Sequence, residues 1–148
     1  MLRLLLLSFV VGTATLAQDV PIAADSALSD MSIKVLMLNR ITPASDTLWG
    51  VEDPQSAAEW KVFDDAAKQL IDAFAQARQG GSGNSDRKWA SKAAWQTYID
   101  EEVAALDAAR QAIKLRNLEQ LWEANDALYT PCETCHVEFN PGVASDDH

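Results

Sequence analysis

The sequence predicts an all-α protein, folded as an antiparallel up-down four-helix bundle. Strand signals are nearly absent, because no segment sustains apolar–polar alternation and no Asn-Gly turn joins two β-branched runs. Apolar residues instead recur at three- and four-residue spacing in four segments, at about residues 27–49, 56–79, 86–114 and 117–139. The connections between these segments are short, which favours antiparallel neighbours packed in one bundle.

The first helix is expected over about residues 27–49. Thr42-Pro43 should interrupt it, because proline lacks an N–H donor and its ring crowds the preceding turn. Thr42 could then cap a new turn with Pro43 at its first position. The helix-spaced positions before this point are Ile33, Leu36, Met37, Arg40 and Ile41.

The second and third helices have the most regular apolar stripes. The second stripe consists of Trp60, Phe63, Ala67, Leu70, Phe74 and Ala77. The glycine-rich run 80–85 follows it and is the one flexible loop that the sequence predicts. The third stripe consists of Trp95, Ile99, Val103, Leu106 and Ile113. We expect the five Trp of the chain to serve mainly as core residues.

The fourth helix is expected to start at Asn117, with Gln120 three residues later as its capping partner. Its stripe consists of Leu118, Leu121, Asn125, Leu128, Cys132 and Cys135. Pro131 falls inside this stripe, and Thr130 before it could cap a new helix. The sequence therefore predicts a kink or a one-turn break just before the two cysteines.

The sequence Cys132-Glu133-Thr134-Cys135-His136 is the C-x-x-C-H signature for covalent attachment of c-type haem. Two thiols three residues apart lie on the same side of a helix, and each can form a thioether with a haem vinyl group. His136 would be the proximal iron ligand. The motif predicts one covalent haem c, held by Cys132 and Cys135 near the C-terminal end of the fourth helix.

Other chemistries of a C-x-x-C pair fit this chain less well. The chain has only two Cys and two His, so a four-ligand zinc site would need the terminal His148. A thioredoxin-like redox motif should follow a strand in a βαβ pattern, and no such pattern is visible. A single structural disulfide in a secreted protein is the plainest alternative, but it leaves His136 without a role.

The first 17 residues read as a cleavable signal peptide. Arg3 gives a positive start, an apolar run follows over residues 4–11, and Ala17 is a small residue of the kind that signal peptidase requires. The apolar run is too short for a transmembrane helix, so no membrane insertion is expected. Export agrees with haem attachment outside the bacterial cytoplasm. We therefore expect a periplasmic protein with one domain, residues 18–148.

The strong negative charge disfavours some partners. Removal of residues 1–17 would delete one Arg and no acidic residue, so the net charge would move from −10 to −11. Nucleic acids and anionic membranes select Lys and Arg, so neither is an expected partner. The charge favours docking to a basic patch on a redox partner protein, although solubility alone explains it equally well.

Antiparallel topology should bring the end of the fourth helix beside the start of the first, where a second iron ligand is expected. Of the two methionines after residue 17, Met31 lies at the expected edge of the first helix, whereas Met37 lies one to two turns inside it. Met37 is therefore the predicted distal ligand, with a core-filling role as the alternative. Lys34 and Arg40 could pair with haem propionates or could be solvated charges.

Together, the signal peptide, the four helical segments and the late C-x-x-C-H motif resemble the cytochrome c-prime family. The resemblance covers about residues 27–141. It implies a four-helix bundle with haem c bound by Cys132, Cys135 and His136, and a homodimer through the first two helices as one arrangement. Because Met37 falls at the distal position, the chain resembles the six-coordinate, Met-ligated branch. One departure is residues 137–140, which lack the Arg or Lys that follows the haem His in that family.

Three functional hypotheses follow. The leading one is a periplasmic, non-enzymatic carrier of single electrons. The second is a protein with five-coordinate iron that binds nitric oxide or carbon monoxide. The third is a haem subunit docked permanently to a dehydrogenase or oxidase. The identity of the distal ligand separates the first two. Enzyme activity is not expected, because both His are accounted for, His136 as the haem ligand and His148 as the terminal residue, and the carboxylates follow solvent-face spacing.

Overall fold

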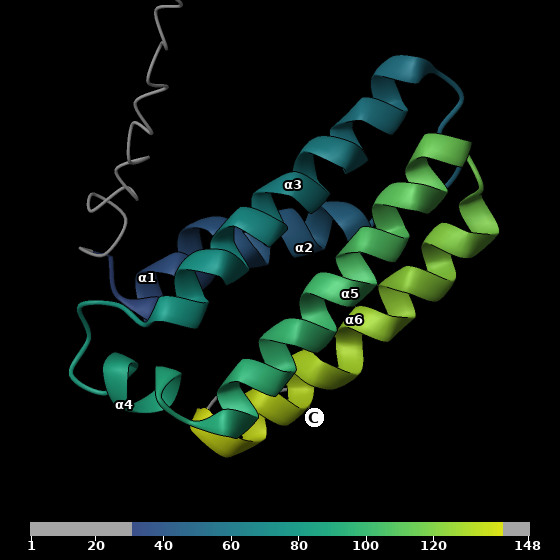
Figure 1. Cartoon of the computed structure of the whole chain (residues 1–148). Coiled ribbons are helices and arrows are strands. Elements are labelled where there is room, and N and C mark those ends of the chain that lie inside the picture. Colours follow the sequence, from purple (N-terminus) through teal and green to yellow (C-terminus); the bar gives the residue numbers. More distant parts are fainter. Residues whose placement is uncertain (1–30, 141–148) are drawn as a thin grey trace, which may run out of the picture.

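The computed structural model describes residues 31–140, and throughout this range the regular elements are helices (Figure 1). They are α1 (Ile33–Leu36), η2 (Met37–Ile41), α2 (Thr42–Trp49), α3 (Ala57–Gln79), α4 (Asp86–Ala90), α5 (Ala93–Leu115) and α6 (Leu118–Phe139). The all-helical prediction is confirmed for this part of the chain. The expected signal segment, the expected first-helix residues 27–30 and His148 lie outside the described residues.

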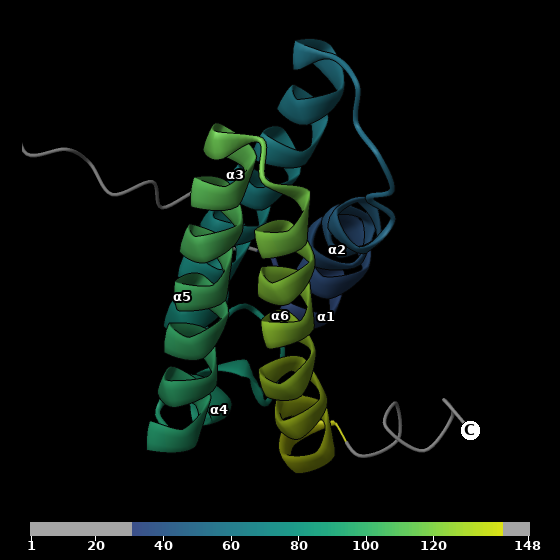
Figure 2. The same ribbon diagram turned by 90° about the vertical axis from the view of Figure 1, so that its right-hand side faces the viewer.

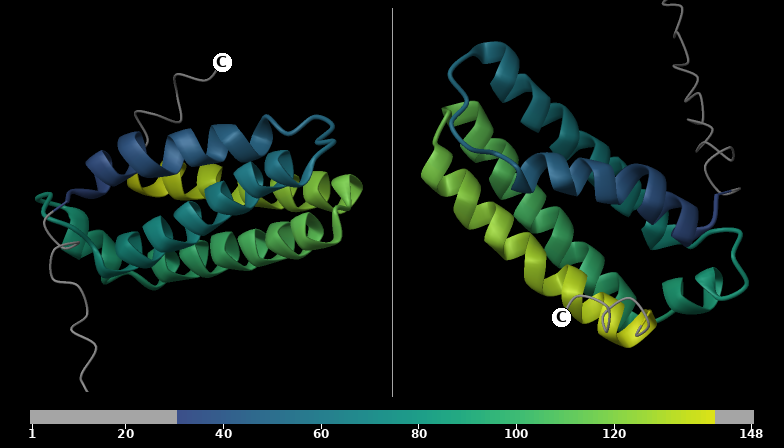
Figure 3. Two further views of the ribbon diagram at one scale, coloured as in Figure 1. Left: turned by 90° about the horizontal axis from the view of Figure 1, so that it is seen from above. Right: turned by 180° about the vertical axis from the view of Figure 1, so that it is seen from behind.

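Helices α1, η2 and α2 follow one another without a break and form a single rod (Figure 3). The predicted interruption at Thr42-Pro43 is seen only as a change of helix type: α2 begins at Thr42 with Pro43 in its first turn, but the chain stays helical through this point and Thr42 is not the cap. The chain accommodates Pro43 through a π-helical segment, in which the Thr42 N–H donates to the Met37 carbonyl five residues earlier. The side chain of Gln69 on α3 donates to the Arg40 carbonyl at 3.0 Å, so a backbone acceptor inside the π segment is satisfied from a neighbouring helix.

The starts of α3 and α6 follow the capping rules. At α3, the Ser56 hydroxyl accepts from the Glu59 N–H while the Glu59 carboxylate accepts from the Ser56 N–H, which is a complete capping box. At α6, the Asn117 side chain accepts from the Gln120 N–H at 3.1 Å, as the sequence predicted. These bonds satisfy N–H groups that have no partner within their own helices.

Two further expectations about helix continuity need correction. The predicted third helix is divided at Ser91 and Lys92 into the short α4 and the long α5. The predicted break before the cysteines does not occur, because α6 continues through Pro131. Pro131 is buried, and α5 and α6 pack side by side along their length (Figure 2). This packing keeps α6 continuous at a residue that would end an isolated helix.

The core lies between α3, α5, α6 and the α1–η2–α2 rod. Its fully buried large side chains are Leu48, Leu70, Leu106 and Leu121. The predicted stripes face this core, although some of their apolar residues are only partly buried, including Met37, Phe63, Val103, Leu118 and Cys135. The expectation that Trp residues fill the core fails at Trp49 and Trp122, which are 44% and 49% exposed.

Candidate functional site

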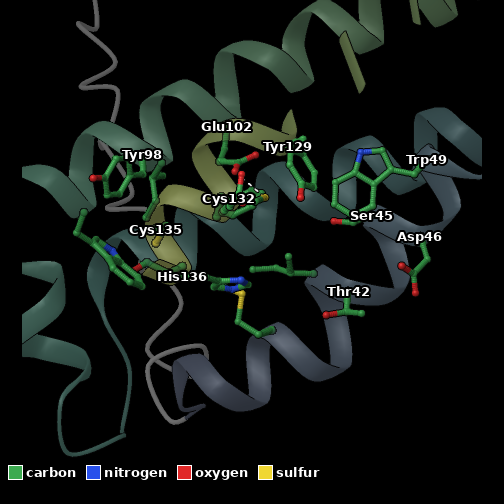
Figure 4. Close-up of a pocket in the computed structure, with 17 residues that line it drawn as sticks. Thr42, Ser45, Asp46, Trp49, Tyr98, Glu102, Tyr129, Cys132, Cys135 and His136 are labelled. Carbon is green, nitrogen blue, oxygen red and sulfur yellow. Dashed lines mark hydrogen bonds between the residues drawn. The ribbon is translucent and has the colours of Figure 1, made fainter. Parts of the chain in front are cut away.

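A cavity of about 450 Å³ opens between the rod, α3, α5 and α6, which is a volume typical of small-molecule and cofactor sites (Figure 4). The lining from the rod is Met37, Ile41, Thr42, Ser45, Asp46 and Trp49. The lining from the other helices is Phe74, Ala77, Trp95, Tyr98, Ile99, Glu102, Tyr129, Cys132, Glu133, Cys135 and His136.

All three functional residues of the C-x-x-C-H motif line this cavity. Cys132, Cys135 and His136 come from the last two turns of α6. Because Cys132 and Cys135 are three residues apart on a continuous helix, their side chains share one side of it. Both cysteines are free thiols in the structure. The cavity therefore receives two thiols and one imidazole from a single helical surface (Figure 4).

The structure separates the two candidate methionines. Met37 is the first residue of η2 and lines the cavity from the rod, whereas the motif residues line it from α6. Met31 packs against the core and is not part of the lining. The two candidate propionate partners, Lys34 and Arg40, are also outside the lining, and Lys34 is exposed.

Burial and nearby acids hold both cysteines in the thiol form. The Cys132 thiol donates to Oε1 of Glu102 at 2.7 Å. Burial, followed by the charge of Glu102, raises the pKa of Cys132 far above its ordinary value, and the same causes raise the pKa of Cys135 to about 12. Cysteines of redox C-x-x-C motifs, by contrast, have lowered pKa values that favour the thiolate. The raised pKa values disfavour the thiolate and therefore the disulfide exchange that is typical of redox C-x-x-C motifs.

Glu102 is a residue of the cavity that sequence reasoning missed. Its side chain is only 3% exposed, and burial raises the pKa of its carboxyl group to about 7. The expectation that the carboxylates lie on solvent faces is therefore wrong at this position. The signal was present in the sequence, because Glu102 lies three residues after Ile99 and four before Leu106 and so falls on the buried stripe of α5.

The polar part of the lining is acidic. Its carboxyl groups belong to Asp46, Glu102 and Glu133, of which Asp46 and Glu133 are exposed. None of the described lining residues is a Lys or an Arg. A negatively charged group of a ligand in this cavity must therefore face solvent or find a cation outside the lining.

An aromatic cluster fixes the end of α6 beside the cavity. The ring of Phe139 packs edge-on against Trp95 on α5, with ring centroids 5.2 Å apart, and Trp95 also stacks on Trp89. The Trp95 indole N–H donates to the Ala77 carbonyl on α3 at 3.0 Å. The Tyr98 hydroxyl donates to Glu138 on α6 at 2.9 Å. These contacts hold the turn that carries His136 against α5.

No group of three or more His, Cys, Asp or Glu among residues 31–140 could hold a metal ion. No helix in the same range is both long enough and apolar enough to cross a membrane. Comparison of the chain with protein-family models, with curated proteins and with solved structures found no match.

Proposed function

We propose that this protein is a c-type cytochrome that carries single electrons between redox partners. One observation supports the proposal above the others: the C-x-x-C-H residues of α6 and Met37 of η2 line the same cavity from different walls. The donor set is that of a covalent haem with one imidazole and one thioether ligand. The apolar walls formed by Phe74 and Trp95 suit a flat aromatic cofactor.

Each residue has a distinct role in this proposal. Cys132 and Cys135 would anchor the haem through thioethers, and both are free to form them. His136 and Met37 would be the two protein ligands of the iron. The haem supplies the one-electron chemistry when it is bound. The thioether ligand would favour the reduced state.

The finer aspects of the fold belong to the same proposal. We infer the antiparallel up-down order of the cytochrome c-prime family, with the chain in its Met-ligated branch. The proposal also includes export to the periplasm, removal of residues 1–17 and a redox partner with a basic patch. The net charge of −10 supports such a partner through electrostatic steering.

The test is a spectrum of protein produced in a host with haem-attachment machinery. We expect haem that resists acid-acetone extraction, a low-spin spectrum and the weak far-red band of sulfur-ligated ferric haem. Haem that is extracted, or a Cys132–Cys135 disulfide, would overturn the proposal. Conversion to alanine at His136 should give a high-spin or misligated product.

A matched pair of variants identifies the distal ligand. Met37→Leu should abolish the far-red band and open the iron to carbon monoxide, while Met31→Leu should change neither property. High-spin wild-type protein that binds carbon monoxide rapidly would instead support the gas-binding function. Loss of the band in Met31→Leu alone would show that the wrong methionine was assigned while leaving electron transfer intact.

A further inference from the structure

Glu102 combines burial with incomplete hydrogen bonding at the wall of the cavity. Its Oε1 accepts the Cys132 thiol hydrogen at 2.7 Å. Its Oε2 is buried, and no donor among the described residues reaches it. A buried carboxylate oxygen without a donor costs free energy that an exposed one does not. The fold alone therefore gives no reason for a buried carboxyl group at this position, and we expect its role to concern the group that occupies the cavity.

Haem attachment would remove the one donor that Glu102 has. When the Cys132 thiol adds across a vinyl group, sulfur bonds to one vinyl carbon and the thiol hydrogen goes to the other. The thioether sulfur then has no hydrogen to donate to Glu102. Both oxygens of the carboxylate are left without a donor from the described residues, so its negative charge depends on a positive charge in the cavity.

The iron is the only such charge that the lining permits. The titratable groups that face the cavity are Tyr98 from α5, Asp46 from α2, and Tyr129, Cys132, Glu133, Cys135 and His136 from α6, and α3 and η2 contribute none. Glu101, the neighbour of Glu102 on α5, is also acidic and exposed. None of these groups is a Lys or an Arg. Reduction of ferric to ferrous iron removes one positive charge from this acidic surrounding.

We propose that Glu102 takes up a proton when the haem is reduced and releases it when the haem is oxidised. This inference rests on the proposed function. A one-electron donor protein supplies the electron that converts ferric to ferrous iron, and one proton from water neutralises the Glu102 carboxylate. The protein would then carry a proton together with its electron. Burial raises the pKa of Glu102 to about 7 even while the Cys132 thiol donates to it, so the carboxyl group already has a high proton affinity before that donor is lost.

The test measures the reduction potential of the holoprotein between pH 5 and 9. We expect the potential of the wild type to fall as the pH rises through neutrality, because reduction takes up a proton. A tenfold difference in the proton affinity of Glu102 between the oxidised and the reduced protein changes the potential of a one-electron couple by about 59 mV. Over this pH range, the potential of Glu102→Gln should therefore fall less than that of the wild type by at least this amount. Glu101→Gln removes an acid from the exposed neighbouring position and should keep the fall.

A measurement on the wild type alone makes the test independent of variant folding. Redox-difference infrared spectra near pH 7 should show a protonated carboxyl band that appears on reduction. Its absence, or a Glu102→Gln potential that falls as much as the wild-type potential, would overturn the inference while the covalent haem still supported electron transfer. Failure to obtain covalent haem would overturn both proposals.

Discussion

Asp86 connects two distant parts of the chain, and its replacement should weaken the fold at the rod that carries Met37. Asp86 is the first residue of α4 and is only 4% exposed. Its Oδ2 accepts from the N–H of Ile33, the first residue of α1, at 2.9 Å, and from the N–H of Gly83 at 2.8 Å. The Ile33 N–H has no acceptor within its own helix, because it belongs to the first turn.

The expected loss follows from these two bonds. Asp86→Ala leaves the Ile33 N–H buried without its charged acceptor and also removes the acceptor of Gly83. A hydrogen bond to a charged group contributes about 1.5–3 kcal/mol, and a buried donor left unpaired costs about 1–3 kcal/mol. Both ranges include the loss of the same hydrogen bond, so they are not added together. We therefore expect Asp86→Ala to lower the free energy of unfolding by about 2–4 kcal/mol. Asp86→Asn keeps an oxygen acceptor without the charge and should lose less.

Urea unfolding at neutral pH measures this loss, provided that the m-value is unchanged. Asp107→Ala is a suitable control, because Asp107 is exposed on α5. Its effect should stay within about 0.5 kcal/mol. Met37 lies one turn after Ile33, so the holoprotein of Asp86→Ala should also show a weaker far-red band. An effect on stability no larger than that of Asp107→Ala would refute the reasoning.

Two other predictions concern buried polar groups. The raised pKa of Glu102, about 7, means that the folded chain holds this proton more tightly than the unfolded chain, so its contribution to stability is full below the ordinary glutamate pKa and is lost as the pH rises to about 7. Between pH 4.5 and 8, the free energy of unfolding of Glu102→Gln, measured with urea, should therefore rise by up to about 3 kcal/mol relative to that of the wild type. A difference between the two proteins that stays constant with pH would contradict this. Asn125→Ala should lose about 2 kcal/mol, because the Asn125 amide donates to the buried Leu48 carbonyl at 2.7 Å; the exposed Asp126→Ala is the control, and equal stabilities would show that this bond contributes little.

The helices themselves were predictable because local signals and packing agree along most of the chain. At α3, the capping box at Ser56 and the apolar stripe through Leu70 predict the same helix. At Pro131, the local signal and the packing disagree. A proline disfavours the helix interior, but the long contact between α5 and α6 keeps the helix continuous. Such a contact joins residues far apart in sequence, so periodicity within one segment cannot reveal it.

The candidate site was predictable at its sulfur and imidazole residues but not at Glu102. The C-x-x-C-H motif assigns Cys132, Cys135 and His136 by residue type and spacing alone. Glu102 has no motif, and its residue type argues for exposure, since glutamate is rarely buried without a partner. Its place on the α5 stripe argued for burial. At such a conflict, position on the stripe was the better guide, and conflicts of this kind occur preferentially at functional sites.

The π segment gives a physical reason why Met37 and the residues after it share one wall of the cavity. In an α-helix, residues four apart drift steadily around the axis, because one turn takes 3.6 residues. A π turn takes in an extra residue, so η2 turns the chain less per residue and offsets that drift. Met37, Ile41 and Ser45, each four residues from the next, all line the cavity. The proline that seemed to end the first helix thus marks the point where the helix changes its register. Met37 is the first residue of this π segment, and it lines the cavity that Cys132, Cys135 and His136 also line.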